Sequence, residues 1–126
     1  LSGARVEQYD ALVLPGGQIN PDLLRVNPEA LALIKAFADA GKPVAAVCHA
    51  PWLLVEAGLA EGKTLTGYKS IVTDLKNAGA NFVDQEVALD ANLITSRCPD
   101  DLPAFGKAIA EMVSEKASAE MAGVIP

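Results

Sequence analysis

Short apolar runs alternate along the chain with longer stretches of helical periodicity. The runs Tyr9–Leu14 and Val44–Val47 are apolar at successive positions, which predicts strands that are buried on both faces. Between them, Asn27 can cap a helix whose first position is Pro28, and Gly41 can end it in a left-handed conformation. We therefore expect a helix from Pro28 to about residue 40. Its apolar stripe consists of Leu31, Ile34, Phe37 and Ala38.

The second half of the chain continues the alternation in shorter elements. Strands are expected at 63–66, 87–89 and 93–95, the last two joined in a hairpin by the polar turn 90–92. Helices are expected at 51–57, at 71–78 and from Asp101 onward, and one further turn at 21–25. The last helix places these apolar residues on one face: Leu102, Phe105, Ile109 and Met112.

This order of elements predicts an α/β fold, in which a mostly parallel sheet is covered by helices on both sides. The 126 residues form a single domain by this interpretation, with a frayed tail at 119–126. About four core strands make a small sheet for this architecture. We therefore expect that the complete sheet has further strands, from a segment upstream of Leu1 that this sequence does not include.

Composition and charge limit the partners and the cellular location that we expect. The net charge is −6 and the ten Lys and Arg residues are scattered, which argues against a nucleic-acid partner. The chain has no apolar stretch long enough to span a bilayer and no signal-peptide core at its start, so we expect no membrane partner and a cytoplasmic location. Two cysteines and one histidine, outside any zinc-ligand spacing, predict no disulfide framework, no metal and no cofactor.

The candidate chemistry lies at Cys48 and His49, directly after the run Val44–Val47 and before a predicted helix. A thiol on such a strand-to-helix turn faces helix N–H groups that favour the thiolate, and ligands of parallel α/β sheets bind at this edge. As an isolated dipeptide, a buried structural cysteine is the commoner interpretation. Gly16 and Gly17 end the neighbouring strand, and although Pro-Gly-Gly is most often an ordinary turn, their N–H groups could bind an oxyanion in the same pocket.

Several segments, in this order, closely resemble the PfpI family of intracellular cysteine proteases and deglycases, whose superfamily includes the parkinsonism-associated deglycase. They are the residues 9–17 ending in Pro-Gly-Gly, 41–51 around Cys48, 77–84, Ser96-Arg97 and Asp101-Leu102. The resemblance implies a flavodoxin-like three-layer sandwich that forms a homo-oligomer, either a dimer or a hexamer.

The resemblance also implies roles for individual residues. Cys48 would be the nucleophile and His49 its partner, while Asp22 would orient His49 across a subunit interface. Tyr68 would line the pocket. Without the resemblance, Asp22 would be taken as an ordinary acid at a helix start and Tyr68 as a surface aromatic.

This chain departs from the family pattern in three respects. It resembles the carboxyl-terminal two-thirds of a family member, because relatives begin with further strands and a glutamate that hydrogen-bonds the thiol. Ala50 stands where many relatives have glycine, and Cys98 has no family role. Cys98 is interpreted as incidental, with oxidation possible if it is exposed.

Three functions follow as hypotheses. The first is cysteine-dependent conversion of α-oxoaldehydes or their protein adducts, of the glyoxalase III or deglycase type, in stress protection. The second is an intracellular cysteine peptidase that uses the same Cys48 and His49, and the third is a redox-sensing chaperone without turnover. A class I glutamine amidotransferase is disfavoured because no histidine follows His49.

Overall fold

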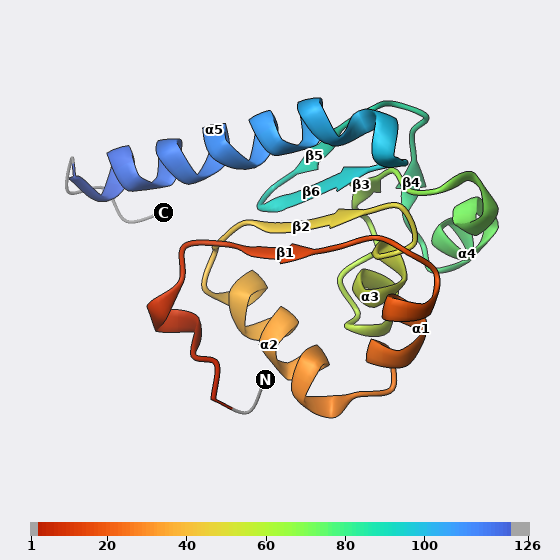
Figure 1. Ribbon diagram of the computed structural model, residues 1–126, viewed down its shortest axis with the longest axis horizontal. Helices are drawn as coiled ribbons and strands as arrows, with labels where there is room; N and C mark the ends of the chain where they lie inside the picture. The colour runs from red at the N-terminus through yellow and green to blue at the C-terminus, as the bar shows by residue number, and fades with distance from the viewer. Residues whose placement is uncertain (1–2, 122–126) are drawn as a thin grey trace.

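The computed structural model describes residues 3–121, with side chains through residue 118. Four strands form the main sheet in the order β1-β2-β6-β5 (Figure 1). β1, β2 and β6 are parallel, and β5 pairs with β6 in the antiparallel sense. The strands are β1 (Leu12–Leu14), β2 (Val44–Val47), β5 (Ala88–Asp90) and β6 (Leu93–Ser96).

Helices cover both faces of this sheet, as the apolar runs predict. α1 (Ile19–Leu24), α2 (Pro28–Asp39) and α3 (Pro51–Glu56) lie on one side, and α5 (Leu102–Met121) lies on the other (Figure 1). Two apolar clusters separate the layers: Val44 and Ala46 face α2 and α3, whereas Ala45 and Val47 face α5. Every residue of β2 and β6 is buried. The flavodoxin-like α/β sandwich with a mostly parallel sheet is therefore confirmed.

A smaller unit stands at the carboxyl ends of the parallel strands (Figure 1). The strands β3 (Thr64–Leu65) and β4 (Asn81–Phe82) pair in parallel, and α4 (Val72–Asn77) connects them. Short 3₁₀ turns complete the described chain at Val6–Gln8, Lys69–Ile71 and Pro99–Asp101. The pattern does not predict β4, because two residues are too few to show a period.

The residues that begin and end α2 are those that the sequence predicts. The side chain of Asn27 accepts hydrogen bonds from the N–H groups of Glu29 and Ala30 at 3.0 and 3.1 Å, and Pro28 occupies the first position of the helix. Gly41 follows the helix with a φ of 72°. Caps at both ends fix where the chain leaves α2 and enters β2, and thereby where β2 ends.

Other boundaries differ from the predicted ones. The first strand is shorter than 9–14, because a 3₁₀ turn ends just before Tyr9, which is half-exposed. The turn expected at 21–25 is the helix α1, which begins at Ile19. The frayed tail expected at 119–126 lies partly outside the described residues, and helix α5 continues through Met121. No helix in the described part of the chain is long and apolar enough to cross a membrane.

Candidate active site

Cys48 occupies a strained turn between β2 and α3. Its φ is 66°, in the left-handed region that residues with a Cβ rarely adopt. Both backbone polar groups of Cys48 are held by neighbouring segments: its N–H donates to Ser96 O at 3.1 Å, and its carbonyl accepts from Tyr68 N–H at 2.8 Å. Such strain persists only where the surroundings enforce it, and it is a recurrent property of nucleophile turns.

Gly16 packs directly against this turn. A Cβ at Gly16 would lie 3.0 Å from the Cβ of Cys48 and 3.8 Å from its Sγ, so only glycine fits without displacement. The next residue, Gly17, has a φ of 88°, which also favours glycine. The structure thus brings together the two glycines and the cysteine that the sequence singled out.

Three backbone N–H groups beside the thiol are free of acceptors among the described residues, namely those of Gly16, Gly17 and His49. The N–H of the residue after a nucleophile, together with one from a neighbouring loop, is a common oxyanion-binding pair. The sequence pattern predicts the glycine amides as oxyanion donors, and the structure adds the amide of His49 as a further candidate.

The start of α3 differs from the expectation of several unpaired N–H groups facing the thiol. The N–H groups of Ala50, Trp52 and Leu53 donate to Val47 O, His49 O and Ala50 O respectively, and Pro51 has none. α3 is also only six residues long. The amide of His49 is therefore the donor that this turn leaves available.

Four contacts within one chain position the half-buried His49 ring. Its Nδ1 lies 3.3 Å from Cys48 Sγ, and its Nε2 lies 3.1 Å from Ser70 Oγ. The ring stacks on Tyr68 with a centroid distance of 4.7 Å and meets Trp52 edge-on at 5.3 Å. Ser70 and Trp52 were not predicted as site residues, because neither carries a motif in the sequence.

Trp52 is itself anchored by charged residues. Its Nε1–H donates to Asp74 at 2.9 Å, and the guanidinium of Arg25 lies 5.3 Å from its ring centroid. Arg25 in turn pairs with Glu56 at 3.1 Å. Because Arg25 is the residue after α1, these contacts tie α1 to the base of the site.

Asp22 is not among the residues that meet His49 within this chain. It is exposed on α1, and its carboxylate makes no hydrogen bond or ion pair with another described side chain. The role expected for Asp22 was across a subunit interface, so that role stays a prediction. Within one chain, Ser70 occupies the Nε2 side of the histidine.

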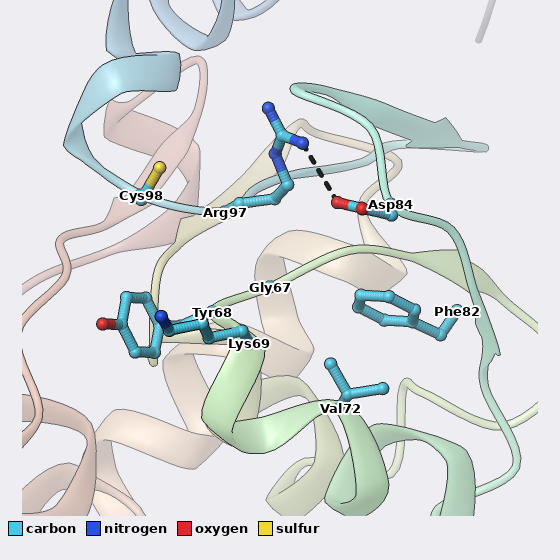
Figure 2. Close-up of a pocket in the computed structure, with 8 residues that line it drawn as sticks. All are labelled: Gly67, Tyr68, Lys69, Val72, Phe82, Asp84, Arg97 and Cys98. Atoms are coloured by element: carbon cyan, nitrogen blue, oxygen red, sulfur yellow. Dashed lines mark hydrogen bonds and ion pairs between the residues drawn. The ribbon is translucent and has the colours of Figure 1, made fainter.

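Two hollows lie near Cys48 and His49. An apolar hollow of about 360 Å³ is lined by Cys48, Gly16, Gly17, Val13, Leu102 and Phe105. A second, of about 470 Å³, has Tyr68 in its wall together with Lys69, Val72, Phe82, Arg97 and Cys98 (Figure 2). No group of three or more His, Cys, Asp or Glu side chains in the described part of the chain is arranged to hold a metal.

Arg97 and Asp101 form the rigid support beside the second hollow. Asp101 is 2 % exposed and accepts from Arg97 N, Nε and Nη2, each at 2.9 Å. The hydrogen bond from the Arg97 side chain is the largest cause that holds the pKa of Asp101 below its usual value. Arg97 also pairs with Asp84 at 3.0 Å, which joins the end of β6 to the loop after β4.

Comparisons with known proteins identify the family of the chain. Residues 1–112 match the model of the DJ-1/PfpI family. The chain is 50% identical over 101 residues to "Protein/nucleic acid deglycase 2" of Escherichia coli, covering 79% of this chain and 58% of that protein. It is 48% identical over 107 residues to "Putative cysteine protease YraA" of Bacillus subtilis, covering 85% and 63%. The chain thus spans about 60% of the length of these relatives.

Solved structures with the same fold include a two-domain protein from Anabaena variabilis, which contains DJ-1/ThiJ/PfpI-like and ferritin-like domains. Its TM-score is 0.86 at 43% identity, over 89% of this chain and 32% of that one. DJ-1 of Schizosaccharomyces pombe gives a TM-score of 0.77 at 31% identity, over 83% and 55%. The resemblance to the PfpI family that the sequence segments carry is therefore confirmed, and this chain belongs to the DJ-1/PfpI family.

Proposed function

We propose that Cys48 and His49 carry out cysteine-dependent conversion of α-oxoaldehydes, free or as adducts on thiols and amines. The observation that carries this proposal is the contact of 3.3 Å between Cys48 Sγ and His49 Nδ1, beside three available N–H donors. The name of the Escherichia coli relative, a deglycase, supports the same reaction class.

The reaction begins with attack of the thiol on the aldehyde carbon of the free α-oxoaldehyde. An adduct first breaks its bond to the carrier, which leaves as the free thiol or amine and regenerates the aldehyde. His49 takes the thiol proton at Nδ1, while Nε2–H donates to Ser70 Oγ. The negative charge that develops on the aldehyde oxygen faces the N–H groups of Gly16, Gly17 and His49. Protonation of that oxygen gives a hemithioacetal on Cys48.

The second stage moves two electrons within the substrate. The aldehyde carbon loses its hydrogen as a proton to the base, the resulting enediol is protonated at the former ketone carbon, and a thioester remains on Cys48. The aldehyde carbon is oxidised and the ketone carbon is reduced, so no external redox partner is needed. Water then cleaves the thioester, which releases the 2-hydroxy acid and restores the thiol.

The test is lactate formation from methylglyoxal by the intact protein. Cys48→Ser should abolish it, whereas Cys98→Ser should retain it, because Cys98 does not contact His49. Undiminished turnover by Cys48→Ser would reject the assignment.

A cysteine peptidase is the second candidate, favoured by the name of the Bacillus subtilis relative. Attack of the same thiol on a peptide carbonyl would use the same donors and the same histidine. Cleavage of casein or of aminoacyl-coumarins, measured beside methylglyoxal turnover on one preparation, distinguishes the two. For either reaction we propose a homo-oligomer in which the partner's copy of Asp22 approaches His49.

A further inference from the structure

Trp52 is a neighbour of His49 to which the chemistry proposed above assigns no role. It lies three residues after His49, at the start of α3, and its backbone N–H donates to His49 O at 3.0 Å. Residues three positions apart lie on the same face of a helical turn, so the indole and the imidazole meet. Their centroids are 5.3 Å apart and the angle between the ring planes is 62°.

Two elements other than α3 fix the indole of Trp52. Its Nε1–H donates to Asp74 on α4 at 2.9 Å, and the guanidinium of Arg25, the residue after α1, lies 5.3 Å from its ring centroid. Arg25 also pairs at 3.1 Å with Glu56, which lies four residues after Trp52 on α3. Helices α1 and α4 both contact α3, and Trp52 is held between them (Figure 1).

The other neighbours of the imidazole are held less firmly. Ser70 is exposed, so water competes for its hydrogen bond with Nε2 of His49. The Tyr68 ring stacks on the imidazole, but its hydroxyl has no hydrogen-bond partner among the described residues. Within the part of the chain that the structure describes, Trp52 is the one neighbour of the His49 ring whose own side chain is held by both a hydrogen bond and a cation.

A fixed indole restricts the orientation of the imidazole. The imidazole can rotate about its Cβ–Cγ bond, and that rotation would take Nδ1 away from Cys48 Sγ, which lies 3.3 Å from it. A single hydrogen bond to each ring nitrogen opposes the rotation only weakly. Edge-to-face aromatic pairs have a preferred geometry, so an indole that cannot move favours the imidazole orientation that the structure shows.

We propose that Trp52 is a positioning residue that keeps Nδ1 of His49 directed at Cys48, and that Arg25 acts on the site through Trp52. This inference rests on the proposed function and deepens it, because it makes the orientation of the base depend on where α1 lies. The indole itself does not take part in the reaction, so its effect is exerted through His49.

The experiment uses variants of the intact protein in which Cys98 is replaced by serine, so that Cys48 is the one thiol that reacts. It measures methylglyoxal conversion and the rate of Cys48 alkylation by iodoacetamide at pH 7. Trp52→Leu removes the aromatic contact, and Trp52→Phe keeps an aromatic ring. Arg25→Gln removes the cation, both by itself and combined with Trp52→Leu.

Two controls match these variants. Tyr9→Leu replaces an aromatic residue that is half-exposed, and Arg5→Gln replaces an exposed arginine. Both residues lie before β1, outside the site, and both controls should match the wild type.

Trp52→Leu should lower kcat about fivefold with little change in KM. It should slow alkylation to a similar extent, because a histidine turned away from the thiol no longer favours the thiolate. Trp52→Phe should stay within about twofold of the wild type. Arg25→Gln should lower both rates about threefold by itself and cause no further loss when it is combined with Trp52→Leu.

Fluorescence gives a test that needs no substitution at Trp52. It is the only tryptophan in the sequence, and a protonated imidazole in contact with an indole quenches the indole emission. The emission of the wild type should therefore fall as His49 gains a proton, and His49→Gln should remove that step. Steps that remain in His49→Gln belong to the other titratable or charged groups that face the two rings: Cys48, Tyr68, Asp74 and Arg25.

A folded Trp52→Leu variant with the kcat and alkylation rate of the wild type, or with a loss confined to KM, would overturn the positioning role and leave the proposed function intact. A further loss on adding Arg25→Gln to Trp52→Leu would overturn the action of Arg25 through Trp52. If thermal melting shows that Trp52→Leu is unfolded, a wild-type emission without a step that His49→Gln removes would overturn the positioning role. Wild-type protein that forms no lactate would reject the proposed function alone, because the alkylation rates and the emission test the placement of His49 without a substrate.

Discussion

Ser70 Oγ lies 3.1 Å from Nε2 of His49, on the side of the ring opposite the thiol of Cys48. In the proposed reaction His49 accepts the thiol proton at Nδ1, both ring nitrogens then carry hydrogen, and Ser70 accepts the hydrogen bond from Nε2. In that reaction Ser70 would be a positioning residue that keeps Nδ1 directed at Cys48. In this single chain it stands where a catalytic triad has its third member.

Replacing Ser70 by alanine should lower kcat about tenfold with little change in KM, the amount that corresponds to the weaker end of hydrogen bonds from a charged donor. Ser70→Thr keeps the hydroxyl and should restore most of the rate. Ser114→Ala removes an exposed serine on α5 and serves as the control. Methylglyoxal turnover at saturation is the measurement. If Asp22→Asn reduces kcat and Ser70→Ala does not, the histidine is oriented by the carboxylate instead.

Gly16 gives the second prediction. A methyl group there would lie 3.0 Å from the Cys48 Cβ, tighter than nine in ten such contacts in folded proteins, so Gly16→Ala should shift the thiol or the glycine amides by a few tenths of an ångström. We expect at least a tenfold loss of turnover and a changed rate of Cys48 alkylation by iodoacetamide. Gly106→Ala is the matched control, because nothing lies within 4 Å of a Cβ at that position of α5. If Gly16→Ala has the turnover and the alkylation rate of the wild type, the close approach of residue 16 to Cys48 is not required for activity.

The sequence predicts those parts of the site that depend on local signals. Cys48 is found because an apolar run ends beside a helix start, and Gly16 because it ends the neighbouring strand. Both positions follow from strand order and from the rule that parallel strands end at one edge. The helix cap at Asn27 is predicted for the same reason, since its two hydrogen bonds span only three residues.

The parts that escape prediction depend on contacts between distant segments. Ser70 reaches His49 because Tyr68 N–H donates to Cys48 O. That hydrogen bond holds the loop after β3 against the turn between β2 and α3. A serine in a polar loop carries no periodic signal, and strand β4 is too short to show one. The one available hint is Tyr68, which the family resemblance places in the pocket two residues before Ser70; it indicates proximity without identifying the contact.

Arg97 and Asp101 give a prediction about stability and pH. The pKa of Asp101 in the folded state lies below the ordinary value of 3.8, so the pair stabilises the fold at pH values above 3.8. That contribution is lost as the pH falls through the lower folded-state pKa. Asp101→Asn should reduce the free energy of unfolding at pH 7 by about 2–3 kcal/mol, because it leaves Arg97 without its buried partner.

Urea denaturation of the wild type and of Asp101→Asn at a series of pH values checks this prediction. The difference between them should shrink as the pH falls below 3.8, where Asp101 gains a proton in the unfolded state and then in the folded state. Asp100→Asn, at an exposed neighbouring carboxylate, is the control and should change little. If the difference in the free energy of unfolding between the wild type and Asp101→Asn does not vary with pH, the packing of the Asp101 side chain, and not its charge, stabilises the fold.

The last prediction concerns the uncovered part of the sheet. β1 is an edge strand, and Val13 faces the α5 side beyond the reach of that helix, with 47% of its surface exposed. Leu102 is 48% exposed and lines the same apolar hollow. An apolar edge with free backbone groups favours pairing with other chains.

Residues 1–126 expressed by themselves should therefore aggregate, and Val13→Lys should reduce that aggregation by placing a charge on the edge. Static light scattering at matched protein concentration is the measurement, with Val26→Lys as the control because Val26 is exposed in the segment between α1 and α2. A monodisperse wild-type chain with a cooperative thermal transition would contradict the prediction. Equal improvement by both lysine variants would attribute the effect to the removal of any exposed valine and not to the strand edge. Net charge would not explain it, since either substitution moves the charge from −6 toward neutrality, which favours aggregation.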